Sequence, residues 1–159
     1  MPIPLLPQRA DNTYRGSKAA LWLFALPLLM KLAISLGCLF NGHQAAGSAD
    51  GIPLDTFTPA GARTVVALFA ILGLSDFSFC LVCIVVLIRY RTLIPLMFVL
   101  LVLEHLGRRL ILLFLPIPRT GTPPGFAINL ALLALLIVGL VLSLRSRDTS
   151  PAPGRRDNP

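Results

Sequence analysis

Residues 64–88 read TVVALFAILGLSDFSFCLVCIVVLI, an apolar stretch in which Asp76 is the only charged residue. Arg63 and Arg89 bound the stretch at its two ends. It is slightly longer than the roughly 20 residues that a helix needs to cross the hydrocarbon core of a bilayer. The pattern therefore predicts a membrane-spanning helix.

Three further apolar stretches lie on either side of this one, at about residues 19–40, 93–115 and 126–144. Over all 159 residues the chain is 55% hydrophobic and 13% charged, with a mean hydropathy of +0.80. A soluble domain of this size has too small a core to bury so much apolar surface, whereas lipid accepts it. The sequence predicts an all-α integral membrane protein, a bundle of four spanning helices.

The segments between the four stretches indicate how the spans are connected. Residues 41–63 are rich in Gly, Ala, Pro and Asp, which predicts a polar loop of moderate length. Residues 89–92 are only long enough for a tight turn, so the second and third spans are expected to be antiparallel neighbours. Residues 116–125 contain prolines and glycines that end a helix. The order is therefore up-down-up-down, followed by a tail, residues 145–159, that is expected to be disordered.

The basic residues predict the orientation, because short cytoplasmic loops carry an excess of Lys and Arg. Nine of them fall on one side of the predicted spans: Arg9, Arg15, Lys18, Arg89, Arg91, Arg145, Arg147, Arg155 and Arg156. The other side has only Arg63 and Arg119. Both ends, including the N-terminal segment 1–18, are therefore expected in the cytoplasm of a bacterium, with the bundle in its inner membrane. The first span is too long for a cleaved signal peptide and is expected to be retained.

The net charge of +7 arises from basic residues that lie near the ends of hydrophobic segments. A nucleic-acid-binding protein would gather them into one patch. Flanking basic residues instead set topology and contact anionic lipid head groups. The lipid bilayer is the expected partner, and nucleic acid is not.

Polar side chains within the predicted spans are costly in lipid and therefore mark candidate sites. Residues 104, 105, 108 and 109 fall on one arc of about 140° of a helix. Depth along each span places the whole set in one layer, from the bilayer midplane to the outer leaflet. With a neutral histidine, the layer would carry a net charge of about +1. The candidates are Lys31, Asp76, Glu104, His105, Arg108, Arg109 and Asn129.

This predicted layer has three interpretations. It could be a structural network, with Glu104 and Arg108 paired along one helix, Lys31 and Asp76 paired across helices, and Arg109 reaching outward to head groups. It could be a ligand or proton site, in which arginines bind an anionic or carbonyl-bearing partner such as a lipid head group or a quinone. It could also be an interface of an oligomer.

Cys80 and Cys83 form a CxxC motif, which resembles that of the disulfide-oxidising DsbB family and the vitamin K epoxide reductases. Those families carry the motif at the outer end of a span and a second cysteine pair in a loop. Here the motif lies deep in a span, the outer loops contain no cysteine, and Cys38 is too far away to pair. Ordinary buried cysteines are the favoured interpretation. His43 and His105 are isolated, so no metal site is expected.

The order Ile-Leu-Gly-Leu-Ser-Asp at residues 71–76, an apolar run, and Arg-Tyr-Arg at residues 89–91 resembles the DoxX-like group of small four-helix bacterial membrane proteins. In that comparison Asp76 stands where the group commonly has Glu, and Arg91 is the turn arginine. The resemblance implies a four-helix bundle and an accessory role beside respiratory or redox enzymes.

The sequence favours a non-catalytic protein: an accessory or assembly subunit, or a lipid- or quinone-associated bundle, within a larger membrane complex or a homo-oligomer. The second hypothesis is a small proton-coupled transporter that uses Glu104, Asp76 and Arg108. The third is a thiol redox enzyme that uses Cys80 and Cys83. No nucleotide-binding loop, catalytic triad or metal site in the sequence supports an enzyme of the soluble type.

Overall fold

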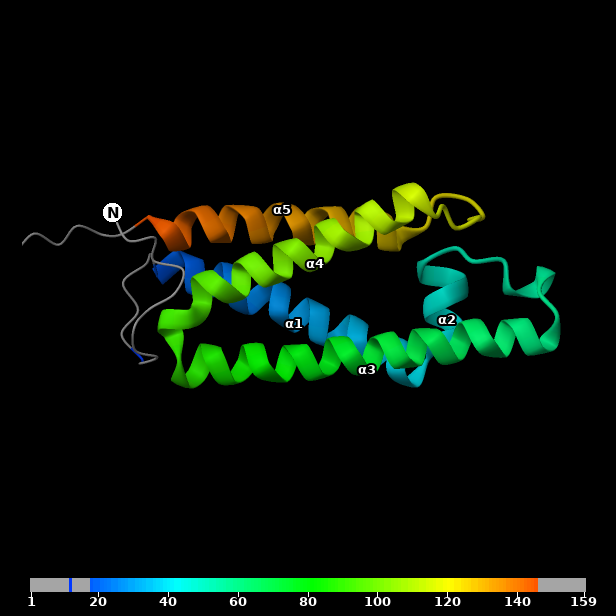
Figure 1. Ribbon diagram of the computed structural model, residues 1–159, viewed down its shortest axis with the longest axis horizontal. Coiled ribbons are helices and arrows are strands. Elements are labelled where there is room, and N and C mark those ends of the chain that lie inside the picture. Colours follow the sequence, from blue (N-terminus) through cyan, green and yellow to red (C-terminus); the bar gives the residue numbers. More distant parts are fainter. Residues whose placement is uncertain (1–11, 13–17, 146–159) are drawn as a thin grey trace, which may run out of the picture.

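Four long helices dominate the computed structural model, which describes residue 12 and residues 18–145 (Figure 1). They are α1 (Lys18–Phe40), α3 (Pro59–Arg89), α4 (Ile94–Phe114) and α5 (Pro124–Leu144). No strand occurs in the described part of the chain, so the prediction of an all-α protein is confirmed for it. The expectations for residues 1–11 and 13–17 and for most of the tail, residues 146–159, lie outside the described residues.

The helix starts follow local chemistry. The side chain of Thr58 accepts a hydrogen bond from the Gly61 N–H, which caps α3, and Pro59 occupies the first turn, where a missing N–H costs nothing. This N-terminal hydrogen bond lets α3 begin five residues before the apolar stretch from which the helix was predicted. Pro95 and Pro124 occupy the first turns of α4 and α5 in the same way.

Three helices of the described chain are long and apolar enough to cross a membrane, namely α1 (over Ala19–Phe40), α3 and α5. The fourth, α4, is of similar length but carries Glu104, Arg108 and Arg109. The three apolar helices also expose many large hydrophobic side chains, as expected of surfaces that face lipid.

The main core lies between the helices, in the half of the bundle nearer the connection between α3 and α4. Phe24 of α1 meets Phe98 of α4 edge to face, with ring centroids 5.1 Å apart. Around this pair pack Leu28, Cys80, Cys83, Val86, Ile94, Met97, Leu101 and Leu136. The core therefore draws on all four long helices.

Helix α1 packs against both α3 and α5, and α4 packs along α5. Close approach of α1 and α3 depends on Gly73, where a Cβ would lie 2.7 Å from the Leu39 nitrogen and 2.8 Å from the Ser35 oxygen. The expected turn between α3 and α4 is present as the 3-10 segment η3 (Arg91–Leu93). From this turn, however, α3 and α4 diverge and have little direct contact, because α4 follows α5 (Figure 1).

Residues 41–58 were expected to form a polar loop, but they fold into a small unit that we call the cap. It contains α2 (Gly42–Gln44), the π-helical segment η1 (Ala45–Ala49) and the 3-10 segment η2 (Leu54–Thr56). Its apolar residues Ala46, Ile52 and Leu54 are buried and form a second core, against which side chains of α3 pack. The irregular spacing of these three residues gives no helical or strand period, which is why the sequence pattern does not reveal the cap.

The cap also contacts the connection between α4 and α5. The backbone N–H and hydroxyl of Thr120 both donate to the Gly51 carbonyl, at 2.8 and 3.2 Å. Gly51 has a φ of +72°, which favours glycine there. Near the start of α5, a Cβ on Gly125 would lie 2.7 Å from the Ala49 oxygen and 2.9 Å from Asp50 Oδ1. Two segments far apart in sequence are thus fastened together at one end of the helices.

Candidate functional site

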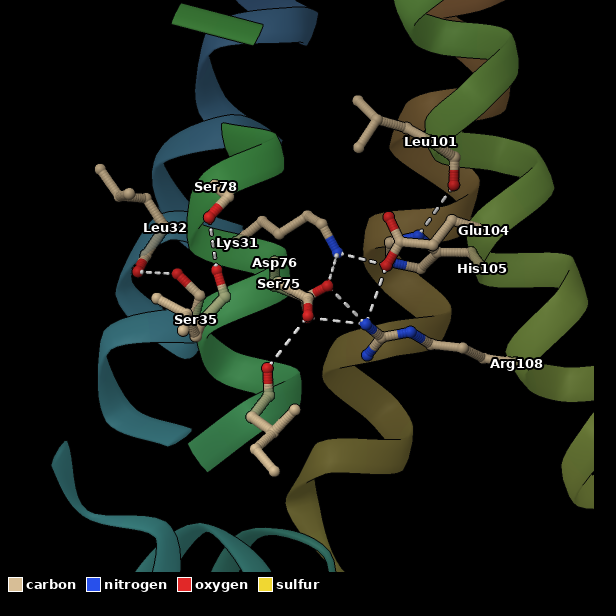
Figure 2. Close-up of polar contacts among 12 residues, drawn as sticks. Lys31, Leu32, Ser35, Ser75, Asp76, Ser78, Leu101, Glu104, His105 and Arg108 are labelled. Carbon is tan, nitrogen blue, oxygen red and sulfur yellow. Dashed lines mark hydrogen bonds and ion pairs between the residues drawn. The ribbon is translucent and has the colours of Figure 1, made fainter. Parts of the chain in front are cut away.

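The amino group of Lys31 lies between two carboxylates that belong to different helices (Figure 2). Its Nζ is 2.7 Å from Glu104 Oε1 on α4 and 3.5 Å from Asp76 Oδ1 on α3. The pair of Lys31 and Asp76 was expected from the sequence, whereas the shorter contact with Glu104 was not.

Arg108 contacts the same two carboxylates from the other side. Its Nη2 lies 2.6 and 2.7 Å from the two carboxylate oxygens of Asp76 and 2.9 Å from Glu104 Oε1. Lys31, Asp76, Arg108 and Glu104 therefore form a closed cycle of four ion pairs in which positive and negative groups alternate. We call this cycle the charge ring. With all four groups ionised, its formal net charge is zero.

Helix geometry explains why these residues meet at one level. Counting 1.5 Å per residue, Lys31 lies about 20 Å from the start of α1, and Asp76 lies about 20 Å from the end of α3. Glu104 lies about 15 Å from the start of α4 by the same rise. Arg108 follows Glu104 by four residues and so shares its face of α4. Helices α1 and α4 run in one direction and α3 in the other, and together they bring four charges to one level along the bundle.

Burial differs around the charge ring. The exposed fractions of the side chains are 8% for Lys31, 16% for Asp76, 24% for Glu104 and 47% for Arg108. Charges buried to this extent are tolerated only when they are paired. The ring supplies each ionised group with two partners of opposite sign, which offsets the cost of removing them from water. Arg108 marks the open side.

Glu104 is not fully satisfied by the ring. Its Oε1 contacts both cations, but its Oε2 is buried and has no hydrogen-bond partner among the described residues. The next residue, His105, points elsewhere: its Nδ1 lies 3.0 Å from the Leu101 carbonyl. The imidazole lines a narrow crevice between α1, α4 and α5 together with Pro27, Leu28, Lys31, Leu101, Leu132 and Leu136. His105 therefore neighbours the charge ring without joining it.

Two other residues expected in the polar layer lie apart from the ring. The guanidinium of Arg109 stands over the ring of Phe126 at 5.2 Å, a cation–π contact between α4 and α5. Asn129 is exposed and donates to the Gly125 carbonyl of its own helix. The expected cluster of net charge about +1 included Arg109, whereas the charge ring leaves Arg109 outside and has a formal net charge of zero.

The three cysteines are free thiols. Cys80 and Cys83 are fully buried in the main core, and Cys38 is partly buried near the end of α1. Within the described part of the chain, no three residues of the metal-ligating types come together. The CxxC motif thus occupies packed interior, as its position in the apolar stretch suggested.

Sequence reasoning did not identify Asp50 of the cap as part of this region. Burial raises the pKa of the Asp50 carboxyl, and the charges of Arg119 and Arg108 act in the opposite direction. Asp50 is therefore close enough to Arg108, on the open side of the charge ring, for the charge of Arg108 to act on it. No local pattern marks it, because its position relative to Arg108 depends on how the cap folds over the helices.

Comparison of the chain with protein families, with curated protein sequences and with solved structures finds no match in any of the three.

Proposed function

We propose that this protein is a non-catalytic accessory or assembly protein of the bacterial inner membrane, in which the charge ring is a joint that holds the helices in register. The observation that carries the proposal is closure of the ring. Lys31, Asp76, Glu104 and Arg108 bind one another in a cycle that links α1, α3 and α4. Groups engaged in this way specify a unique packing of otherwise apolar helices, a role known for buried polar residues.

The proposal includes a fourth membrane span, α4. Its three charged residues set it apart from the other long helices, but each has a partner in the protein. Glu104 and Arg108 belong to the neutral ring, and Arg109 lies over Phe126. Charges that face the interior of a bundle and pair there are the kind that spanning helices tolerate. With α4 included, the chain is a four-helix up-down-up-down bundle.

The orientation of the bundle follows from its basic residues. Nine lie on the side of the termini and the turn between α3 and α4, and two lie on the side of the cap. We therefore assign both termini to the cytoplasm and the cap to the outer face. Reporter fusions after Arg89 and within residues 41–58 test this assignment, since the two positions should report opposite sides.

The accessory role is supported by the similarity to the DoxX-like group at residues 71–76 and 89–91 and by the engagement of the charged groups with one another. Purification of the tagged full chain from native membranes in a mild detergent tests it. We expect a membrane partner to copurify in a fixed ratio. Recovery of the chain as a lone monomer from gently solubilised membranes would contradict the accessory role.

A second candidate function, a small proton-coupled transporter, is favoured by one observation. Glu104 Oε2 is buried and unpartnered, so it is an acceptor that a proton would satisfy. Protonation would remove one negative charge from the ring and weaken its hold on Lys31 and Arg108. The two candidates differ in the expected behaviour of E104Q: the transporter would fold and lose proton flux in proteoliposomes, whereas the joint would lose stability.

A further inference from the structure

Arg108 has donors that the charge ring does not use. A guanidinium carries five N–H groups, on Nε and the two terminal nitrogens. All contacts of Arg108 with Asp76 and Glu104 are made by Nη2. Within the described residues, no hydrogen bond or ion pair engages Nε or Nη1, and 47% of the side chain is exposed. In Figure 2 the second terminal nitrogen points away from the ring.

The depth of Arg108 makes these unused donors costly. It precedes Phe114, the last residue of α4, by six positions, which corresponds to about 9 Å along the helix axis. In the proposed topology it lies between the midplane and the outer boundary of the hydrocarbon. Unsatisfied polar groups cost several kcal/mol there, so an acceptor that binds these donors would stabilise the protein.

The neutrality of the charge ring restricts the chemistry of that acceptor. An anion at Arg108 would approach Asp76 and Glu104 and leave the site with an uncompensated negative charge in a medium of low dielectric constant. A neutral carbonyl oxygen accepts the same hydrogen bonds without that penalty. The charge balance thus separates two ligand classes that arginine alone would bind equally well.

The surroundings of Arg108 suit an amphiphile that carries such a carbonyl. Helices α3 and α4 diverge from their connecting turn and have little direct contact (Figure 1). Leu72 precedes Asp76 on α3 and Ile111 follows Arg108 on α4; each lies about one turn nearer the outer end, on the same helix face. The two residues are 52% and 60% exposed. An apolar molecule in the outer leaflet therefore reaches Arg108 along hydrophobic side chains.

We propose that Arg108 binds the carbonyl oxygen of a neutral amphiphile through Nε and Nη1. The carbonyl can come from a quinone ring or from the ester of a phospholipid. The inference rests on the proposed function, in that it takes α4 as a membrane span and the charge ring as formed. It adds a ligand class to a site whose four members otherwise bind one another.

The test uses the full chain, purified in detergent or placed in lipid nanodiscs, with thermal unfolding as the readout, since a ligand that binds only the folded state raises its melting temperature. The probes are decylubiquinone in detergent, and ester-linked against ether-linked phosphatidylcholine in nanodiscs. R108K keeps a positive charge but lacks the planar fork of donors. R63K is the matched control, since Arg63 is exposed at the outer end of α3.

We expect one probe to stabilise the wild type and R63K, and to bind R108K about tenfold more weakly or worse, the effect of losing one charge-assisted hydrogen bond. Stabilisation by decylubiquinone identifies a quinone site. Stabilisation by ester-linked but not ether-linked lipid identifies a phospholipid carbonyl. Equal effects of either probe on wild type and R108K, or no effect on any variant, would overturn the inference.

A second measurement covers the case in which R108K does not fold. In wild-type protein labelled with nitrogen-15 arginine, the effective probe should shift one Nε–H resonance in the NMR spectrum, and no shift at saturating probe would overturn the inference. A negative result with both probes would overturn ligand binding but not the structural role of the charge ring. That role is tested separately, by the stability of ring variants without any probe. If E104Q were as stable as the wild type, the proposed structural role of the charge ring would be contradicted.

Discussion

Lys31 Nζ on α1 lies 2.7 Å from Glu104 Oε1 on α4, although the two residues are 73 positions apart in the chain. The same carboxylate oxygen is 2.9 Å from Arg108. Both cations thus lie against one carboxylate oxygen, and Glu104 forms the ion pair that joins α1 to α4.

Replacing Glu104 by Gln is expected to lower the free energy of unfolding by about 3 kcal/mol or more, the usual cost of removing one partner from a buried ion pair. The amide is isosteric, so the loss reports charge and not shape. Thermal unfolding of the purified protein in detergent measures it. Asn129→Ala is the control: Asn129 is exposed and bonds only within α5, so a change within about 0.5 kcal/mol is expected.

Exchanging the charges of Lys31 and Glu104 tests whether the ion pairs form a ring. In the K31E/E104K double variant, the 31–104 pair keeps opposite signs. The new Glu at position 31, however, adjoins Asp76, and the new Lys at position 104 adjoins Arg108. We therefore expect the double variant to be no more stable than either single variant in a double-mutant cycle. Recovery to near wild-type stability would mean that the pairs act independently.

Gly73 allows α1 and α3 to approach closely, and Gly73→Ala is expected to push them apart. The added Cβ would meet backbone atoms of Leu39 and Ser35 at less than 3 Å, which flexible side-chain movement cannot relieve. Overpacking of this kind costs about 1–3 kcal/mol. Gly37→Ala is the matched control, because a Cβ there meets nothing within 4 Å. We expect it to be neutral or stabilising by up to about 1 kcal/mol, the helix propensity gained.

Helical periodicity explains how much of the structure was predictable. It located the long helices and placed Glu104 and Arg108 on one face, because both depend only on neighbouring residues. The contacts of Lys31 with Glu104 and of Asp76 with Arg108 depend on how each helix is rotated about its own axis, which periodicity leaves undetermined. Arg109 illustrates what periodicity alone cannot resolve. It lies 100° around the helix from Arg108, and this rotation directs it to Phe126 instead of the charge ring.

Asp50 should make the cap sensitive to pH. Burial raises the pKa of its carboxyl above the value in the unfolded chain, so the folded state binds the proton more tightly. The stabilisation from that proton is complete below about pH 4, the unfolded pKa, and is lost as the pH rises through the folded pKa. Hydrogen exchange of residues 41–58, corrected for its intrinsic pH dependence, should show a tighter cap at acidic pH. Asp50→Asn should remove this dependence, and a cap tightening with rising pH would contradict the assignment.

Thiol accessibility distinguishes packed cysteines from a redox pair. Cys80 and Cys83 have no exposed surface in the main core, whereas Cys38 is partly exposed near the end of α1. In intact membranes, a membrane-permeant maleimide is therefore expected to label Cys38 first and to reach the other two only after denaturation. Prior treatment with a reductant should leave the labelling pattern unchanged, because all three thiols are already free. The variant C38S serves as the control, since it should abolish the rapid phase without changing the slow one. Rapid labelling of Cys80 or Cys83, or labelling that appears only after reduction, would instead favour the thiol redox hypothesis.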